Sequence, residues 1–220
     1  MQRILFILIL IIGTFTLRPI FSQTPSSFTP DQALQKLMEG NQRYVEAKMK
    51  NPRQGAERRE ELTQGQNPFA VVLGCSDSRV PPEVIFDRGL GDLFVVRVAG
   101  NTVGNLGLGS IEYATQILGA PLILVLGHDQ CGAVDAVLKG KPLPGHIQEL
   151  ADHLRPALKV EACQKEKVPL ECSINANVDS NVAQLIGSGP VLAPLIKAGK
   201  LKVVGGRYDL KSGKVVLLGK

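Results

Sequence analysis

The 220-residue sequence contains no tryptophan, and only 5% of its residues are aromatic. Proteins that bind single-stranded nucleic acid stack bases on aromatic side chains placed among positive charges. The lysines and arginines here give a formal net charge of +5, but they are scattered and have no aromatic residues interleaved among them. The composition therefore argues against a nucleic-acid partner.

Internal repeats and low-complexity tracts are also absent from the sequence.

An apolar run from Ile4 to Phe15 follows a single arginine and precedes a polar segment. The run is too short to span a bilayer comfortably. This order is typical of a secretory signal peptide, with an uncleaved anchor or a buried helix as the alternatives. No A-x-A triplet marks the cleavage site. We take Ser22 or Gln23 as the last residue removed and assign residues 1–23 to the signal. We expect a periplasmic or secreted protein without stable membrane contact after signal removal.

The segment at 24–65 is predicted to be a helical arm that precedes the core rather than builds it. Thr29 is a candidate N-cap, Pro30 suits the first helical position, and Leu34, Leu37 and Met38 recur at helical spacing. A polar stretch at 51–64 indicates a second, mostly solvated helix.

The remainder, residues 66–220, alternates short apolar runs with helical patterns. The runs are FAVVLG, LFVVRVA, LILVLG, LKVVGG and KVVLLG, and helical patterns lie at 107–118, 132–138, 146–163 and 175–186. Continuous β-branched runs favour strands buried on both faces. We therefore predict one α/β domain with a mainly parallel central sheet flanked by helices. Ser212-Gly213 between the last two runs predicts a C-terminal β-hairpin.

Metal-capable residues follow two of the predicted strands. Cys75 directly follows the run FAVVLG, and His128 and Cys131 follow the run LILVLG. Because the carboxyl ends of parallel strands share one edge of a sheet, these three side chains can converge. Two thiolates and an imidazole suit a catalytic zinc with one position open to water. Each residue alone is weak evidence, since a lone cysteine after a strand is usually a small buried hydrophobe.

Asp77 and Arg79 lie beside the first of these cysteines. Asp77 could be a conditional fourth ligand that closes the site, or it could pair with Arg79 in a two-pronged salt bridge that leaves the site open. An ordinary ion pair at a helix start is the third interpretation.

The other two cysteines, Cys163 and Cys172, flank a charged loop, and in an exported protein they form either a disulfide or two free thiols.

The motif CSDSR, followed by HxxC, resembles the β-class carbonic anhydrases, and the resemblance extends over nearly all of the chain after the signal. It implies one zinc ion per chain on Cys75, His128 and Cys131, with Asp77 and Arg79 as the catalytic dyad. The implied reaction is the reversible hydration of carbon dioxide to bicarbonate and a proton by a zinc-bound hydroxide that the dyad orients. The resemblance also implies a homodimer or tetramer, with clefts at the interface and N-terminal helices that grip the partner.

Further matches suggest the plant-type branch of that family. The residues that correspond to its substrate cleft are Gln66, Phe94, Tyr113 and Gly132. Another branch has a regulatory bicarbonate site built from tryptophan, arginine and tyrosine. Arg97 and Tyr208 could match two of these, but Val72 occupies the tryptophan position, so we expect an open, water-bearing zinc near neutral pH rather than one capped by Asp77.

Other functions remain open from the sequence. The same fold and zinc could act on carbon disulfide or carbonyl sulfide, or the chain could be a non-catalytic zinc-binding protein. The sequence does not identify the residue that acts as the proton shuttle, although His146 and His153 are candidates.

Overall fold

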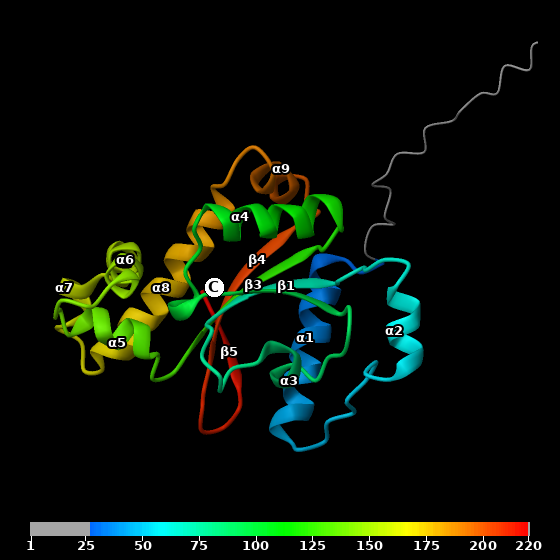
Figure 1. Cartoon of the computed structure of the whole chain (residues 1–220), viewed down its shortest axis with the longest axis horizontal. Helices are drawn as coiled ribbons and strands as arrows, with labels where there is room; N and C mark the ends of the chain where they lie inside the picture. The colour runs from blue at the N-terminus through cyan, green and yellow to red at the C-terminus, as the bar shows by residue number, and fades with distance from the viewer. Residues whose placement is uncertain (1–26, 220) are drawn as a thin grey trace, which may run out of the picture.

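The computed structural model describes residues 27–219 (Figure 1). Helix α1 (Pro30–Val45) begins where the sequence predicts it. The Thr29 hydroxyl accepts a hydrogen bond from the Gln32 backbone, and the Gln32 side chain accepts one from the Thr29 N–H. This reciprocal cap satisfies two backbone donors that a helix start leaves free. The predicted signal peptide lies outside the described residues.

The central sheet has five strands in the order β2-β1-β3-β4-β5. Their bounds are β1 (Ala70–Gly74), β2 (Leu93–Arg97), β3 (Leu122–His128), β4 (Lys202–Tyr208) and β5 (Val215–Leu218). The first four are parallel, and β5 pairs antiparallel with β4 to close the predicted hairpin. The predicted α/β fold is confirmed, with all five apolar runs forming strands.

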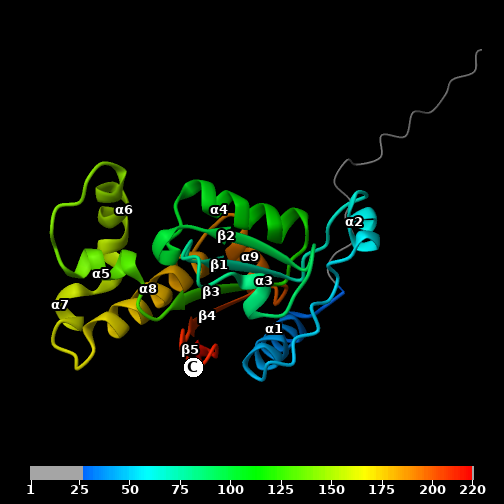
Figure 2. The same ribbon diagram turned by 60° about the horizontal axis from the view of Figure 1, so that its bottom comes forward.

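Helices cover both faces of this sheet (Figures 1 and 2). The remaining helical segments are α2 (Ala56–Leu62), α3 (Pro82–Ile85), η1 (Ala99–Asn101), α4 (Asn105–Glu112), η2 (Tyr113–Ile117), α5 (Gly132–Leu138), α6 (His146–Leu154), η3 (Arg155–Leu158), α7 (Val160–Cys163), α8 (Pro169–Ile186) and α9 (Leu192–Lys197). Among these described residues, no helix is long and apolar enough to cross a membrane.

Two helix predictions need correction. The predicted helix at 146–163 is broken into α6, η3 and α7, because Pro156 cannot donate a backbone hydrogen bond and Lys159 adopts a left-handed φ of 47°. Helix α8 begins at Pro169 rather than at 175, since proline is well suited to the first turn of a helix. The short helices α3 and α9 were not predicted.

The core consists of two apolar layers, one on each side of the sheet. Val72 of β1 belongs to one layer, whereas its neighbours Val71 and Leu73 belong to the other. Ala33 and Leu37 of α1 are fully buried in the first layer. The prediction that the N-terminal helix precedes the core without building it is therefore wrong for α1. The spacing of apolar residues along α1 predicted that one face of the helix is buried, but not which surface that face covers.

Helix α8 lies close against the sheet because two glycines make room for it. A Cβ at Gly127 of β3 would lie 2.7 Å from Val178 Cγ2, and a Cβ at Gly205 of β4 would lie 2.7 Å from Val178 Cγ1. Both approaches are closer than side chains tolerate. This contact fixes α8 beneath the carboxyl end of β3, which is the edge of the sheet that carries the metal-capable residues.

Candidate metal centre

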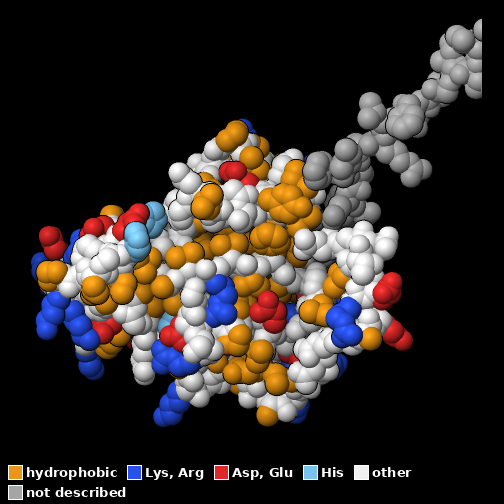
Figure 3. Space-filling view, viewed as in Figure 1, with side chains coloured by type: hydrophobic (Ala, Val, Ile, Leu, Met, Phe, Trp, Pro, Cys, Tyr) orange, Lys and Arg blue, Asp and Glu red, His pale blue; other side chains and the backbone are white. Residues whose placement is uncertain are grey.

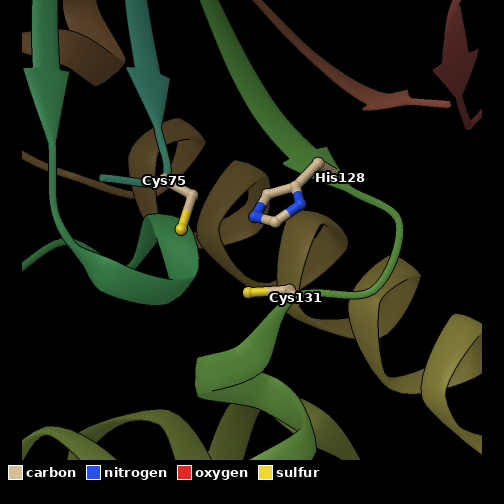
Figure 4. Close-up of side chains that lie close together, drawn as sticks. All are labelled: Cys75, His128 and Cys131. Carbon is tan, nitrogen blue, oxygen red and sulfur yellow. The ribbon is translucent and has the colours of Figure 1, made fainter. Parts of the chain in front are cut away.

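Three metal-capable side chains meet at the carboxyl edge of the sheet (Figure 4). Cys75 follows β1, His128 is the last residue of β3, and Cys131 directly precedes α5. Strands β1 and β3 are parallel neighbours, with Gly74 opposite Leu126. The ligand atoms of the three side chains all lie within 4.8 Å of one another, and all three residues are buried. They form the possible zinc site that the strand ends predict.

The imidazole of His128 is prepared for a metal. Its Nδ1 lies 2.8 Å from the carbonyl oxygen of Asp129. A carbonyl can only accept, so Nδ1 carries the proton and Nε2 presents its lone pair. Nε2 is buried and has no hydrogen-bond partner among residues 27–219. A cation held between this nitrogen and the two sulfurs would satisfy an atom that is otherwise costly to bury.

The Cys75 and Cys131 side chains shift each other's pKa. The hydrogen bond with Cys131 lowers the pKa of Cys75 to about 4 against the opposing effect of burial. The same hydrogen bond, together with burial, raises the pKa of Cys131. The backbone N–H groups of Asp77 and Gly100 donate to Cys75 Sγ over 3.4 and 3.2 Å. Donors aimed at a sulfur, and the ligand set of two sulfurs and one nitrogen, fit a tetrahedral zinc with one further position.

Asp77 and Arg79 form a salt bridge beside these ligands. Arg79 Nε donates to Asp77 Oδ1 over 2.9 Å and Arg79 Nη2 donates to Oδ2 over 2.7 Å. The Arg79 backbone N–H also donates to Oδ1. These bonds hold the pKa of Asp77 well below its usual range, although partial burial opposes them. An ionised carboxylate thus lies near the site, with Oδ2 3.9 Å from His128 Nε2.

Arg97 holds the loop that carries Cys75 and Asp77. Its Nε donates to the Cys75 carbonyl over 2.8 Å, and its Nη2 donates to the Asp77 carbonyl over 2.6 Å. Sequence reasoning placed Arg97 only among residues of a regulatory site and missed this contact. No sequence signal marks it, because the partners are backbone carbonyls twenty and twenty-two positions away. Tyr208, its counterpart in that comparison, is buried and shares a hydrogen bond of 3.1 Å with the Tyr44 hydroxyl.

Comparisons with known proteins identify the family. The sequence model of the carbonic anhydrase family matches residues 70–215. A carbonic anhydrase of Mycolicibacterium smegmatis is 43% identical over 193 residues, which cover 86% of this chain and 93% of the relative. The chain belongs to the β-carbonic anhydrase family.

Solved β-carbonic anhydrases share the fold. A Coccomyxa β-carbonic anhydrase in complex with acetazolamide superposes with a TM-score of 0.69 at 27% identity, covering 85% of this chain and 86% of that one. A tetrameric β-carbonic anhydrase of Sordaria macrospora gives 0.68 at 26% identity, covering 74% and 86%. Family membership makes this protein an enzyme, a carbonic anhydrase (EC 4.2.1.1), as the sequence predicts.

Three residues predicted to line the substrate cleft of this carbonic anhydrase stand apart from the metal-capable residues of the same chain. Phe94 lies opposite Val71, four positions before Cys75, which places it on the order of 13 Å from Cys75 along the strand direction. Tyr113 is near Phe94, with ring centroids 6.4 Å apart. Gln66 lines a separate cavity of about 670 Å³ with Leu62 and other residues near α2. Gly132, by contrast, directly follows Cys131.

The two predicted histidines and the second pair of cysteines are not among the residues that form the candidate metal centre of the carbonic anhydrase. His146 and His153 border a cavity of about 580 Å³ between α4 and α6, and Figure 3 shows histidine side chains at the surface there. Cys163 and Cys172 form a disulfide that joins the end of α7 to the first turn of α8. Of the cysteines that the structure describes, Cys75 and Cys131 are free.

Proposed function

We propose that this protein catalyses the reversible hydration of carbon dioxide to bicarbonate and a proton, with one zinc per chain on Cys75, His128 and Cys131. The observation that carries the proposal is the buried Nε2 of His128, which has no hydrogen-bond partner within the described part of the chain and lies beside two sulfurs and an ionised aspartate. Bound zinc lowers the pKa of water toward neutrality and so supplies a nucleophile at neutral pH. Three protein ligands suit this role, since structural zinc sites usually have four.

Asp77 acts as a fixed hydrogen-bond acceptor in this proposal. Because Arg79 binds both carboxylate oxygens, Asp77 stays ionised and keeps one orientation. Its Oδ2 lies 3.9 Å from His128 Nε2, where it can accept a hydrogen bond from the attacking group and so direct that group's lone pair toward carbon dioxide. The salt bridge favours a site left open for substrate over one in which Asp77 is a fourth ligand. The backbone N–H of Gly132 is proposed to face the substrate.

We also propose that a second copy of the chain completes the substrate cleft, in a homodimer or tetramer. Gln66, Phe94 and Tyr113 lie away from the ligands of their own chain, so they could serve the metal of a partner. Strand β2 is an edge strand, and Leu106 of the neighbouring α4 is 91% exposed. The Sordaria macrospora relative is described as tetrameric. Residues 24–65 are proposed to contribute to this dimer contact as well as to their own core.

Export is a further part of the proposal. Residues 1–23 are proposed to direct the chain to the periplasm or the medium and then to be removed. The Cys163–Cys172 disulfide supports an oxidising compartment.

The proposal is tested by stopped-flow carbon dioxide hydration with a pH indicator, together with metal analysis. Wild type is compared with Asp77→Asn and with Asp31→Asn, a control in which an exposed aspartate on α1 is changed in the same way. We expect about one zinc per chain in all three proteins. Hydration should be fast in wild type and in Asp31→Asn, and it should fall by about 100-fold or more in Asp77→Asn.

Other outcomes favour the alternative functions. Zinc binding without carbon dioxide hydration, but with release of sulfide from carbon disulfide or carbonyl sulfide, would identify a hydrolase on the same fold. Zinc binding with no turnover of any of these substrates would indicate a non-catalytic role.

A further inference from the structure

Helix α8 has polar side chains where it packs into the core. Ser173, Asn177 and Asn181 are at most 3% exposed and recur every four residues, so they lie along one face of the helix. Burial of amide groups is unfavourable unless they are hydrogen-bonded. The hydrogen bonds of Asn177 and Asn181 therefore indicate what these two residues do, whereas Ser173 Oγ has no hydrogen-bond partner among residues 27–219.

Asn177 contacts the turn that faces the metal ligands. Its Nδ2 donates to the carbonyl oxygen of Gly100 over 2.7 Å. Asn181 Nδ2 donates to the Asn177 backbone carbonyl over 2.8 Å and to Asn177 Oδ1 over 3.1 Å. Because Oδ1 can only accept, the bond from Asn181 fixes the orientation of the Asn177 amide with its Nδ2 toward Gly100.

The Gly100 turn has a backbone conformation that needs support. Gly100 has a φ of 75° and Asn101 a φ of 44°, both in the left-handed region. Side chains rarely adopt this region, and a Cβ at Gly100 would also lie 2.9 Å from Leu154 Cδ1. In this conformation the Gly100 N–H points at Cys75 Sγ, 3.2 Å away.

We propose that Asn177, held by Asn181, is a positioning residue that fixes the Gly100 turn so that its N–H donates to the Cys75 thiolate. The inference rests on the proposed function, in which Cys75 is a metal ligand. A hydrogen bond to a ligating sulfur draws electron density away from the metal and fixes the direction of the ligand. Asn177 thus acts on the metal through Gly100 and Cys75, without contact to substrate.

The test uses the full chain loaded with cobalt(II), whose thiolate charge-transfer absorption reports on the sulfur ligands. Wild type is compared with Asn177→Leu, which removes the donor to Gly100, and with Asn181→Ala, which frees the Asn177 amide. Asn41→Leu is the matched control, because Asn41 is also a buried asparagine with bonds to backbone groups, but it lies in α1 and bonds to α3 and the hairpin.

In Asn177→Leu, we expect the charge-transfer band to shift to longer wavelength, since the sulfur loses a donor, and cobalt affinity to fall about 10-fold. Asn181→Ala should give a smaller shift in the same direction. Asn41→Leu should keep the wild-type band and affinity even though it unfolds at lower denaturant concentration.

A wild-type band and affinity in Asn177→Leu would overturn the inference. If Asn177→Leu does not fold, Asn181→Ala decides, and an unshifted band there would overturn it as well. A wild-type protein that binds cobalt without any thiolate band would instead refute the proposed ligand set itself, so the two failures are distinguishable.

Discussion

Replacement of Gly127 by alanine should destabilise the protein through a single steric contact beneath the metal centre. The new Cβ would lie 2.7 Å from Val178 Cγ2 and 3.3 Å from Ile174 Cγ2. Val178 is fully buried, and its Cγ1 already faces the backbone of Gly205, so rotation about χ1 gives no relief. Overpacking of this kind costs about 1–3 kcal/mol of unfolding free energy.

A double-mutant cycle separates this contact from other effects of the substitution. Val178→Ala alone should cost about 2 kcal/mol because it leaves a cavity. In the double variant, the alanine at 127 has room, so the total loss should be smaller than the sum by about 1–3 kcal/mol. Gly109→Ala is the control, since Gly109 is exposed within α4 and a Cβ there meets nothing within 4 Å. That change should stabilise the protein by about 0.5–1 kcal/mol.

The assay is urea unfolding followed by circular dichroism in the presence of a chelator, so that metal binding does not add to stability. We expect a lower midpoint for Gly127→Ala at an unchanged slope. A Gly127→Ala midpoint equal to that of Gly109→Ala would refute the packing argument. So would a double variant whose loss equals the sum of the single losses.

Three further predictions concern the metal site and α1. Arg79→Ala should raise the pKa of Asp77 toward its usual value, because Arg79 is what lowers it. The Asp77 carboxylate of the variant should therefore become protonated at a higher pH than that of wild type. On acidification, hydration activity should accordingly be lost at a higher pH in the variant. Asn41→Leu removes three buried hydrogen bonds and should cost about 3 kcal/mol in urea unfolding without loss of zinc. Chelation should make two thiols per chain reactive toward a thiol reagent, Cys75 and Cys131, as counted by mass spectrometry; modification at any other site would contradict this assignment.

Local sequence patterns were enough to predict the strands, the start of α1 and the cluster of metal-capable residues. Buried parallel strands read as continuous apolar runs because both faces are covered, and β1 has such a pattern throughout. Thr29 and Pro30 mark a helix start through bonds that span only a few residues. The motifs at Cys75 and at His128 and Cys131 predict a site because parallel strands end at a common edge.

Contacts between distant segments could not be predicted in the same way. The role of Arg97 depends on two backbone carbonyls of another loop. The polar residues of α8 are typical of a solvated helix face, and only their spacing of four beside Ile174 and Val178 hinted at a buried stripe. The breaks near Pro156 and Lys159 and the burial of α1 likewise depend on the surfaces that these elements meet.

The sequence by itself determined the fold class, the strand ends and the chemical identity of the candidate ligands, because these follow from local periodicity and from residue type. Only the tertiary structure decided how the ligands are held. It places Gly100 and Arg97 around the Cys75 loop, orients Asp77 on Arg79 and separates Phe94 from the metal-capable residues of its own chain. Such relations depend on distances across the fold, which the order of residues along a chain does not specify.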